Sequence, residues 1–254
     1  IFKYNSRRMI HLLSIEWLKL KQLITLRVIL IVYAILLPLI FYSLSLMKAN
    51  GMFYGEEIYQ FPDVYHYVTY ISSFFNLLIG VIIVVFTCNE IKYKTQRQNL
   101  IDGLSKKELI LSKFYVVTVL SIMITLYTFL VALVFGLCNG STDVFDGIRY
   151  IGFYQISTFG YFIFAFFLSN LLKNPALSIV FYLLSTFLEG ITGLFAMEYS
   201  QFFPLSTLSN LIPMPVLPDG FEYAMTEVQT ASLGLFYALT FMFVSYYILS
   251  KRDV

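Results

Sequence analysis

Residues 89–113, NEIKYKTQRQNLIDGLSKKELILSK, form a polar and charged stretch between two long apolar runs, and they decide the fold. Residues 90–102 contain no Gly or Pro, which predicts one helix of about three turns. Gly103 follows as a residue that easily takes left-handed dihedrals just past a helix end. Residues 105–108, SKKE, have the S-x-x-E form of a capping box, which predicts an abrupt helix start. The pattern predicts a rigid corner; a well-capped loop without a partner is the alternative.

The composition of the whole chain is that of an integral membrane protein. Of its 254 residues, 59% are hydrophobic and only 13% are charged. Soluble domains carry about 25% charged residues. Six apolar runs are long enough to cross a hydrocarbon core of roughly 30 Å; they are residues 28–47, 67–88, 114–137, 150–172, 176–197 and 231–250. The sequence therefore predicts an all-α fold, a single polytopic transmembrane domain over residues 1–254 with six transmembrane helices.

The distribution of basic residues predicts the orientation, because cytoplasmic loops are enriched in Lys and Arg. Except for Lys48 and Arg149, every Lys and Arg lies before the first span, in residues 89–113, between the fourth and fifth spans, or after the sixth. We therefore expect residues 89–113 and both termini to be cytoplasmic. The overall charge of +2 hides this asymmetry and gives no reason to expect a nucleic-acid partner.

Two further segments have patterns typical of membrane surfaces. Residues 6–22 carry apolar side chains, including Trp17, on one helical face and basic or polar ones on the other. This pattern predicts an amphipathic helix lying in the interface. Residues 198–230 are apolar stretches interrupted by four prolines and too short to cross the bilayer. They predict an external re-entrant or interfacial segment.

Polar side chains recur along single faces of three predicted spans. Asn76 lies in the second span, Thr125 in the third, and Ser185 and Glu189 in the fifth. Such stripes mostly serve helix packing and interhelical hydrogen bonds, and lining a pathway is the alternative. Glu189 is the only charged residue inside the predicted spans. It is either a protonated carboxyl group bonded within the bundle or a polar group facing a cavity between subunits.

Motifs of known catalytic chemistry are missing from the sequence. It contains no P-loop, no H-E-x-x-H, no Cys/His metal cluster and no G-x-S-x-G. We therefore expect no catalytic residue, no metal and no cofactor on this chain.

The corner sequence resembles the loop signature of permease subunits of type-2 ATP-binding-cassette (ABC) exporters. In that family an acidic residue ends the second span, Thr and Leu follow, and a Ser-Arg or Ser-Lys restart leads to a Lys. The matching residues here are Glu90, Thr95, Leu100, Ser105, Lys106, Leu109 and Lys113. Lys94 replaces the usual Gly, and Asp102-Gly103 stands where Thr-Pro is common. The similarity extends to the six spans, the N-terminal helix (the family's elbow helix) and the broken external segment.

The resemblance implies a half-transporter in the inner (plasma) membrane, driven by separate ATPase subunits. Two ABC ATPase subunits, which bind ATP and Mg, would dock on residues 89–113, the family's coupling-helix loop. A second permease, identical or homologous, would complete the substrate path within the lipid bilayer. By the family pattern, we expect ATPase-docking residues at Glu90, Lys92, Arg97, Gln98, Asp102 and Ser105. We expect path residues at Asn76, Thr125, Ser185 and Glu189.

Two other classes of membrane protein fit the sequence less well. A stand-alone channel or secondary transporter would normally show several buried ionisable residues or inverted repeats, and a single Glu with no evident repeat counts against it. A polytopic membrane enzyme is opposed by the missing catalytic motifs.

Overall fold

The computed structural model describes residues 14, 16–49, 58–101, 103–195, 197–215 and 224–251, and the regular elements of these residues are all helices. They are α2 (Ile24–Ala49), α3 (Asp63–Lys92), α4 (Thr95–Ile101), α5 (Lys106–Cys138), α6 (Arg149–Leu172), α7 (Pro175–Phe195), α8 (Met197–Ser200), α9 (Pro204–Asn210) and α10 (Glu227–Lys251). Six of them, α2, α3, α5, α6, α7 and α10, are long and apolar enough to cross a membrane. The prediction of an all-α protein with six membrane-spanning helices is confirmed.

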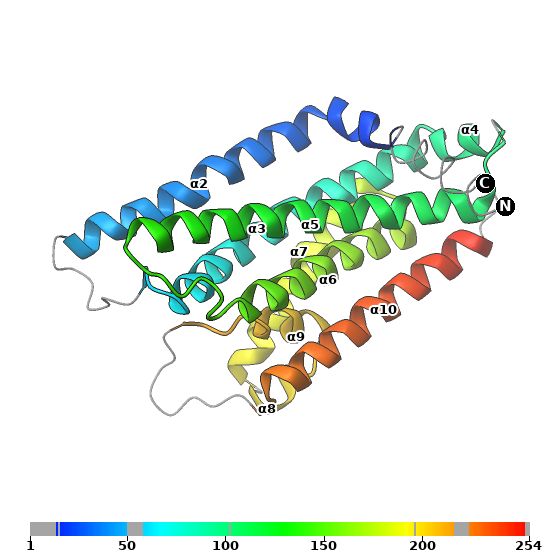
Figure 1. The fold of residues 1–254 in the computed structure, drawn as a ribbon. Helices are drawn as coiled ribbons and strands as arrows, with labels where there is room; N and C mark the ends of the chain where they lie inside the picture. Colours follow the sequence, from blue (N-terminus) through cyan, green and yellow to red (C-terminus); the bar gives the residue numbers. More distant parts are fainter. Residues whose placement is uncertain are drawn as a thin grey trace, which may run out of the picture.

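The six long helices form one bundle around α3 and α6, which pack extensively on each other. Helices α5 and α10 also pack on α6, whereas α2 packs mainly on α3. Helix α2 runs along one edge of the bundle and α10 along the opposite edge (Figure 1). Burial follows this arrangement: about three fifths of the apolar stretches of α3 and α6 are buried (61% each), against 11% for α7 and 22% for α2.

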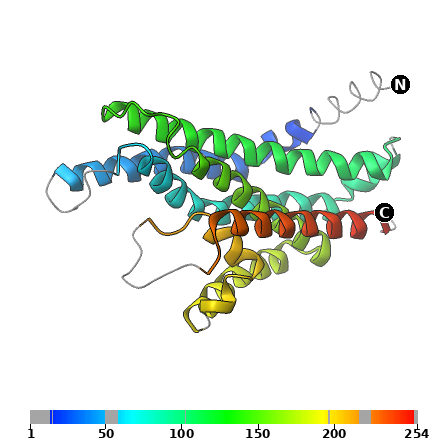
Figure 2. The same ribbon diagram turned by 60° about the horizontal axis from the view of Figure 1, so that its bottom comes forward.

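The two ends of the bundle carry different short helices. Helix α4 lies at the end where α10 finishes, and we call this the α4 end (Figures 1 and 2). The opposite end, where α5 finishes and α6 begins, is called the α9 end. Most basic residues that the structure describes belong to the α4 end: Lys19, Lys21, Arg27, Lys92, Lys94, Arg97, Lys106, Lys107, Lys113, Lys173 and Lys251. The asymmetry seen in the sequence is therefore an asymmetry between the two ends of the folded bundle.

The helix predicted over residues 90–102 is not one helix, and that prediction is wrong. Helix α3 continues to Lys92, and α4 begins at Thr95 after a two-residue turn. The break occurs because Lys94 takes a left-handed conformation, with φ of 55°. The Thr95 hydroxyl donates to the carbonyl of Glu90 over 3.2 Å, which satisfies an acceptor left free by the break. The corner is therefore built from the end of a long helix and a separate short one.

The segment between α7 and α10 folds back onto the α9 end of the bundle. Helix α9 packs against α6, α7 and α10. Apolar side chains in this helix and just after it are buried, with Leu205, Leu208, Leu211 and Ile212 each at most 3% exposed. Gly160 of α6 permits this close approach, because a Cβ there would lie 2.4 Å from Cδ2 of Leu208. The apolar residues between the prolines thus serve as packing for a short inserted helix.

The predicted amphipathic helix over residues 6–22 lies only partly within the described residues. Residues 6–13 and 15 fall outside them, and residues 16–22 are helical. We call these last residues segment 16–22. Its Glu16 and Leu20 are buried, whereas Trp17 and Leu18 are 41% and 58% exposed. Segment 16–22 leads through Leu23 directly into α2, and backbone N–H groups of Leu23 and Arg27 bond back across this junction.

Candidate functional site: the corner between α3 and α5

The start of α5 is fixed by the capping box that the sequence predicts. The Ser105 side chain accepts from the backbone N–H of Glu108, and the Glu108 carboxylate accepts from the Ser105 backbone N–H over 2.9 Å. Gly103 has a φ of 96°, a conformation that costs glycine little. Both features predicted for this turn are therefore confirmed, and they allow the chain to reverse within a few residues.

Helix α4 is held between its neighbours through one face. It packs on both α3 and α5. Gln96 is buried, and together with Leu100 it lines a small cavity that Leu109 of α5 and Leu249 of α10 also line. This contact turns the opposite face of α4 outward.

The outward surface of the corner is basic and partly apolar. Lys92, Arg97, Gln98 and Ser105 are exposed, as the docking prediction requires of a contact surface, and Asp102 lies outside the described residues. Lys94, Lys106 and Lys107 add further exposed cations, while Tyr93 and Ile101 are exposed apolar side chains at 68% and 69%. We call this set the corner surface. A cationic, rigidly mounted short helix with exposed apolar side chains has the properties of a protein-docking element.

Glu90 does not belong to the corner surface, contrary to the prediction that placed it there. Its side chain is only 6% exposed. Glu90 Oε1 accepts from Lys113 Nζ over 2.6 Å and from Lys19 Nζ over 3.4 Å. The carboxylate faces inward because two cations from other segments compensate its charge there.

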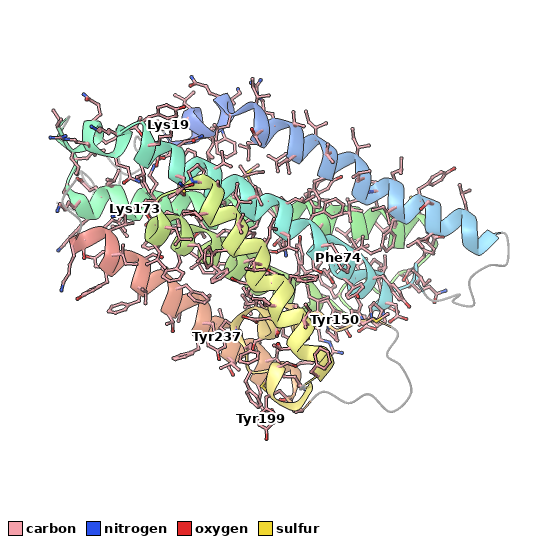
Figure 3. The ribbon with its side chains drawn as sticks, turned by 180° about the vertical axis from the view of Figure 1, so that it is seen from behind. Lys19, Phe74, Tyr150, Lys173, Tyr199 and Tyr237 are labelled. Carbon is pink, nitrogen blue, oxygen red and sulfur yellow. The ribbon has the colours of Figure 1, made fainter. Side chains whose placement is uncertain are left out.

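Four charged side chains from three segments meet at this point, and we call them the ion cluster: Glu16, Lys19, Glu90 and Lys113. Lys113 Nζ also lies 2.5 Å from Glu16 Oε2, and Lys19 Nζ lies 3.1 Å from Glu16 Oε1. The two lysines of the cluster differ in exposure: the side chain of Lys19 is 27% exposed and that of Lys113 only 3%. In Figure 3, Lys19 and Lys173 lie at the α4 end, far from Tyr199. The cluster connects segment 16–22, the end of α3 and the first turns of α5.

The electrostatics of the ion cluster are those of a compensated group in a low-dielectric setting. Burial of Lys19 favours its neutral form, but the negative charges of Glu90 and Glu16 outweigh that effect and raise the pKa of Lys19. Lys113 Nζ also lies 5.0 Å from the centre of the Phe86 ring, a cation–π contact. Within the described part of the chain, no donor reaches Glu90 Oε2. Lys113 therefore bonds two carboxylates at once, and Glu90 Oε2 accepts no hydrogen bond from the described residues.

Sequence reasoning missed two members of the ion cluster, Glu16 and Lys19. One signal was available: Glu16 is the only acidic residue before Glu56, and it lies four residues before the apolar Leu20. Residues four apart share a helix face, so a single acid on the apolar side of a basic helix indicates a buried partner. The identity of that partner, nearly one hundred residues away, requires the fold.

The predicted path residues Asn76 and Thr125 lie inside the single chain. Asn76 is fully buried, and its Oδ1 accepts from the hydroxyls of Tyr154 and Thr158 over 3.2 and 3.3 Å. The Tyr154 hydroxyl is hydrogen-bonded to the Ser72 hydroxyl over 2.7 Å, and the Ser72 hydroxyl is bonded in turn to the hydroxyl of Tyr33 of α2 over 2.6 Å. These contacts give Asn76 an interhelical packing role in this state. Thr125 is 6% exposed, and its hydroxyl has no partner among the described residues.

The other two predicted path residues, Ser185 and Glu189, lie on α7, the least buried span. The Ser185 hydroxyl donates to the carbonyl of Phe181 in its own helix. Glu189 Oε2 accepts backbone N–H bonds from Leu205 and Ser206 over 2.8 and 2.7 Å. These are orphan donors in the first turn of α9, so Glu189 caps that helix from outside. The hydrogen-bonded alternative for Glu189 thus describes its contacts in this structure.

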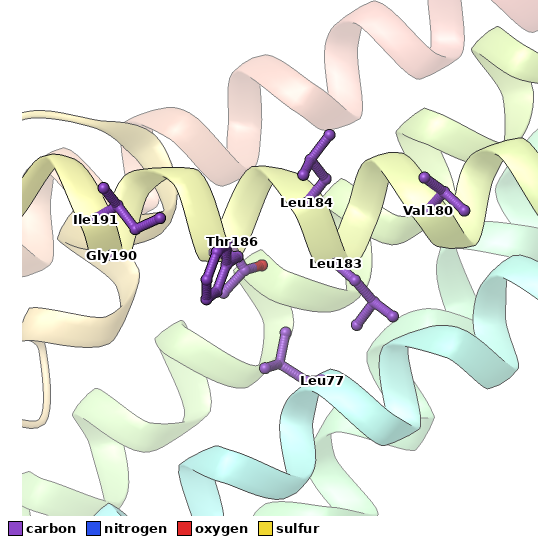
Figure 4. Close-up of a pocket in the computed structure, with 8 residues that line it drawn as sticks. Leu77, Val180, Leu183, Leu184, Thr186, Gly190 and Ile191 are labelled. Carbon is purple, nitrogen blue, oxygen red and sulfur yellow. The ribbon is translucent and has the colours of Figure 1, made fainter.

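An open apolar groove of about 810 Å³ lies between α3 and α7 (Figure 4). It is lined by Leu77, Val180, Leu183, Leu184, Thr186, Phe187, Gly190 and Ile191. None of the four predicted path residues lines it, although Leu77 follows Asn76 directly and Gly190 follows Glu189. Among the described residues, no group of three His, Cys, Asp or Glu side chains could hold a metal ion.

Comparison with known proteins bears on most of this architecture. Residues 12–189 match a family described as ABC-2 family transporter protein. The matched region begins just before segment 16–22 and includes the ion cluster, the corner surface and most of α7. No curated protein matches the sequence. Because the match covers well over half of the chain, the chain belongs to the ABC-2 transporter family and is a membrane permease subunit of an ABC transporter.

Proposed function

We propose that this chain is the permease of an exporter powered by separate ATPase subunits that dock on the corner surface. Two ATPase subunits, each binding ATP and Mg, serve a pair of permeases in the inner (plasma) membrane, with the α4 end in the cytoplasm. The observation that carries the proposal is the corner surface: Arg97 and Gln98 project from a short helix whose other face packs on α3 and α5, and the exposed Lys92 lies beside it at the end of α3. A groove on the ATPase would receive α4 as a helix-in-groove contact.

The construction of the corner supports force transmission through α4. The capping box fixes the start of α5, and the buried face of α4 lies against the cavity lined by Leu100 and Leu109. A partner that pushes on the corner surface therefore displaces the ends of two spans rather than a loose loop. Closure of the ATPases on ATP biases the permease when their contact differs between its two conformations.

The pairing of two permeases is part of the same proposal. Helix α7 carries Ser185 and Glu189 and exposes most of its apolar surface, which supports it as the span that faces the partner permease and the substrate path. Asn76 and Thr125 are buried within one chain. They would line the path only in another conformation, in which the helices that bury them separate.

Co-purification from native membranes tests the docking. Tagged protein should retain an ATPase chain with a P-loop, identified by mass spectrometry. The double variant Lys92→Glu with Arg97→Glu should release that chain, because it reverses two charges on the corner surface. A cross-linker placed at Gln98 should capture the same ATPase.

The matched control is Lys251→Glu, which changes an exposed cation at the α4 end but outside the corner surface. It should retain the ATPase. If no ATPase is ever found with the wild-type protein, the proposal fails and a stand-alone channel or secondary transporter becomes the better assignment. If the double variant still binds the ATPase as tightly as the control does, docking on α4 is wrong.

A further inference from the structure

The ion cluster connects segment 16–22, the end of α3 and the first turns of α5 through bonds between charged side chains. Segment 16–22 has two buried anchors, Leu20 and Glu16. Leu20 lies against the turns of α3 and α5 at the α4 end, where it lines a small cavity with Phe86 and Val116. Apolar contact of this kind holds a helix on a surface but does not fix its position along that surface. Glu16 is different, because its carboxylate is bonded to Lys113 of α5 at 2.5 Å.

Segment 16–22 is also the direct continuation of α2. The backbone N–H of Leu23 bonds to the carbonyl of Leu20, and that of Arg27 bonds to Leu23. Helix α2 is a peripheral span that packs mainly on α3. Glu16 is therefore a directional anchor for the α4 end of α2, beside buried apolar side chains such as Leu26.

Lys113 is placed to connect this span to the corner. It lies in the first two turns of α5, beyond the capping box at Ser105, and α4 packs on the same part of the helix. Its ammonium group bonds Glu16 on one side and Glu90 at the end of α3 on the other. All three side chains are at most 6% exposed, so water does not compete for these bonds.

We propose that Lys113 is a positioning residue that locks the α4 end of α2 to the corner, so that α2 moves with α3 and α5 when a docked ATPase displaces α4. This inference rests on the proposed function for its driving force. Buried ion pairs contribute little net stability compared with apolar packing, and their best-attested value is in fixing one geometry. A lock between the peripheral span α2 and the corner that the ATPase displaces requires such a fixed geometry.

Lys19 has a secondary place in this lock. It is 27% exposed, and its distances to Glu16 and Glu90 are 3.1 and 3.4 Å, longer than those made by Lys113. Water and salt screen a partly exposed pair more than a buried one. Removing Lys19 should therefore loosen the lock far less than removing Lys113.

Distance measurements between spin labels test the lock in the permease–ATPase complex. One label replaces Ile24 at the start of α2 and the other Leu111 in α5, both exposed, in a background of Cys88→Ala and Cys138→Ser. The wild-type sequence should give a narrow distance distribution that stays the same without nucleotide and with ATP and vanadate. Lys113→Met should broaden the distribution and make it shift when ATP and vanadate are added.

Rescue separates a lock from general stability. Lys113→Arg keeps a cation that can bond both Glu16 and Glu90, so it should restore the narrow, nucleotide-independent distribution that Lys113→Met loses. Glu16→Gln keeps the Lys113–Glu90 pair, so it should fold even if Lys113→Met does not, and it should loosen only the α2 label. Lys21→Met removes an exposed cation of segment 16–22 that belongs to neither the corner surface nor the ion cluster, and it should change nothing.

The possible failures are distinguishable by the state of the ATPase. If Glu16→Gln and Lys113→Met leave the distribution narrow while the ATPase remains bound and hydrolyses ATP, the lock is wrong and the docking stands. The lock is also wrong if Lys113→Arg gives the same broad distribution as Lys113→Met in a complex that retains the ATPase. If the wild-type protein does not bind an ATPase at all, the proposed function is at fault, and the nucleotide-free distances still report whether Lys113 holds α2.

Discussion

The two ends of the bundle are held together by different kinds of contact. At the α4 end, a few bonds between formal charges connect segment 16–22, α3 and α5 through Lys113. At the α9 end, the apolar side chains of α9 pack into the space left by Gly160, and one carboxylate, Glu189, caps the helix. Apolar burial scales with area and has no preferred direction, whereas a bonded charge fixes the direction and distance of its partner.

This difference matches the tasks proposed for the two ends. A receiving corner must convey displacement to particular spans, so a small number of directional bonds suits it. An inserted helix at the other end has to exclude water and lipid over an area, which apolar packing achieves. The comparison predicts that substitutions at the α4 end act through charge and those at the α9 end through volume.

Lys113→Met should have the largest effect on stability. It leaves Glu16 and Glu90 buried with only the partly exposed Lys19 nearby, and breaking a buried pair from one side costs about 3–5 kcal/mol. Thermal unfolding of the detergent-solubilised protein should show a clear loss of Tm. Lys107→Met, which removes an exposed cation, should unfold like the wild type; equal Tm values for the two variants would contradict the directional role of the cluster.

Leu208→Ala tests the volume side of the comparison. Leu208 is fully buried against Gly160, and truncating a buried Leu costs about 2–5 kcal/mol, depending on how far the site collapses. Adding Gly160→Ala should partly fill the space, so the double variant should be more stable than the sum of the two single effects predicts. Strict additivity in thermal unfolding would show that these side chains do not meet.

Glu189→Ala should have a smaller and local effect. The variant leaves the backbone N–H groups of Leu205 and Ser206 without their acceptor, at a cost of about 1–3 kcal/mol. Hydrogen exchange followed by mass spectrometry should show faster exchange in α9 and unchanged exchange in α4 and the first turns of α5. Faster exchange at both ends would mean that the ends are not held independently.

Lys94→Gly should have the smallest effect, and it sharpens the description of the corner. A left-handed φ costs a non-glycine residue roughly 1–2 kcal/mol, and the greater freedom of glycine in the unfolded chain offsets about 0.5–1 kcal/mol of that gain. The variant should therefore be neutral or slightly stabilised in thermal unfolding. Lys92→Gly, at the last residue of α3, provides the opposite case and should be destabilised.

The sequence predicts the spans and the turn at Gly103 because these depend on local chemistry. A long apolar run, a capping box and a positive-φ glycine are each decided by neighbouring residues, and the structure has all three. The break at Lys94 was also accessible: the resemblance indicated a glycine there, and glycine in such a position suggests a left-handed turn. The prediction of one helix over residues 90–102 gave helix propensity more weight than the replacement of the family's glycine by Lys94.

The ion cluster and the contacts of Glu189 were not predictable in the same way. Glu16 and Lys113 are separated by 97 positions, and several other lysines could have compensated the same carboxylate. The choice depends on how segment 16–22 lies across α3 and α5. Similarly, nothing local to Glu189 indicates that its partners are backbone amides of a helix that begins fifteen residues later. Side chains that bridge distant segments need the fold before their roles can be assigned.

The ion cluster has an electrical consequence as well. Two lysines and two glutamates carry formal charges that cancel, and all four lie at the end of the membrane-spanning helices. Moving one elementary charge through the whole transmembrane potential involves about 2.3 kcal/mol per 100 mV, whereas a neutral group moving as a unit does no such work. The cluster itself would therefore add no dependence on the membrane potential to a stroke that carries all four side chains along.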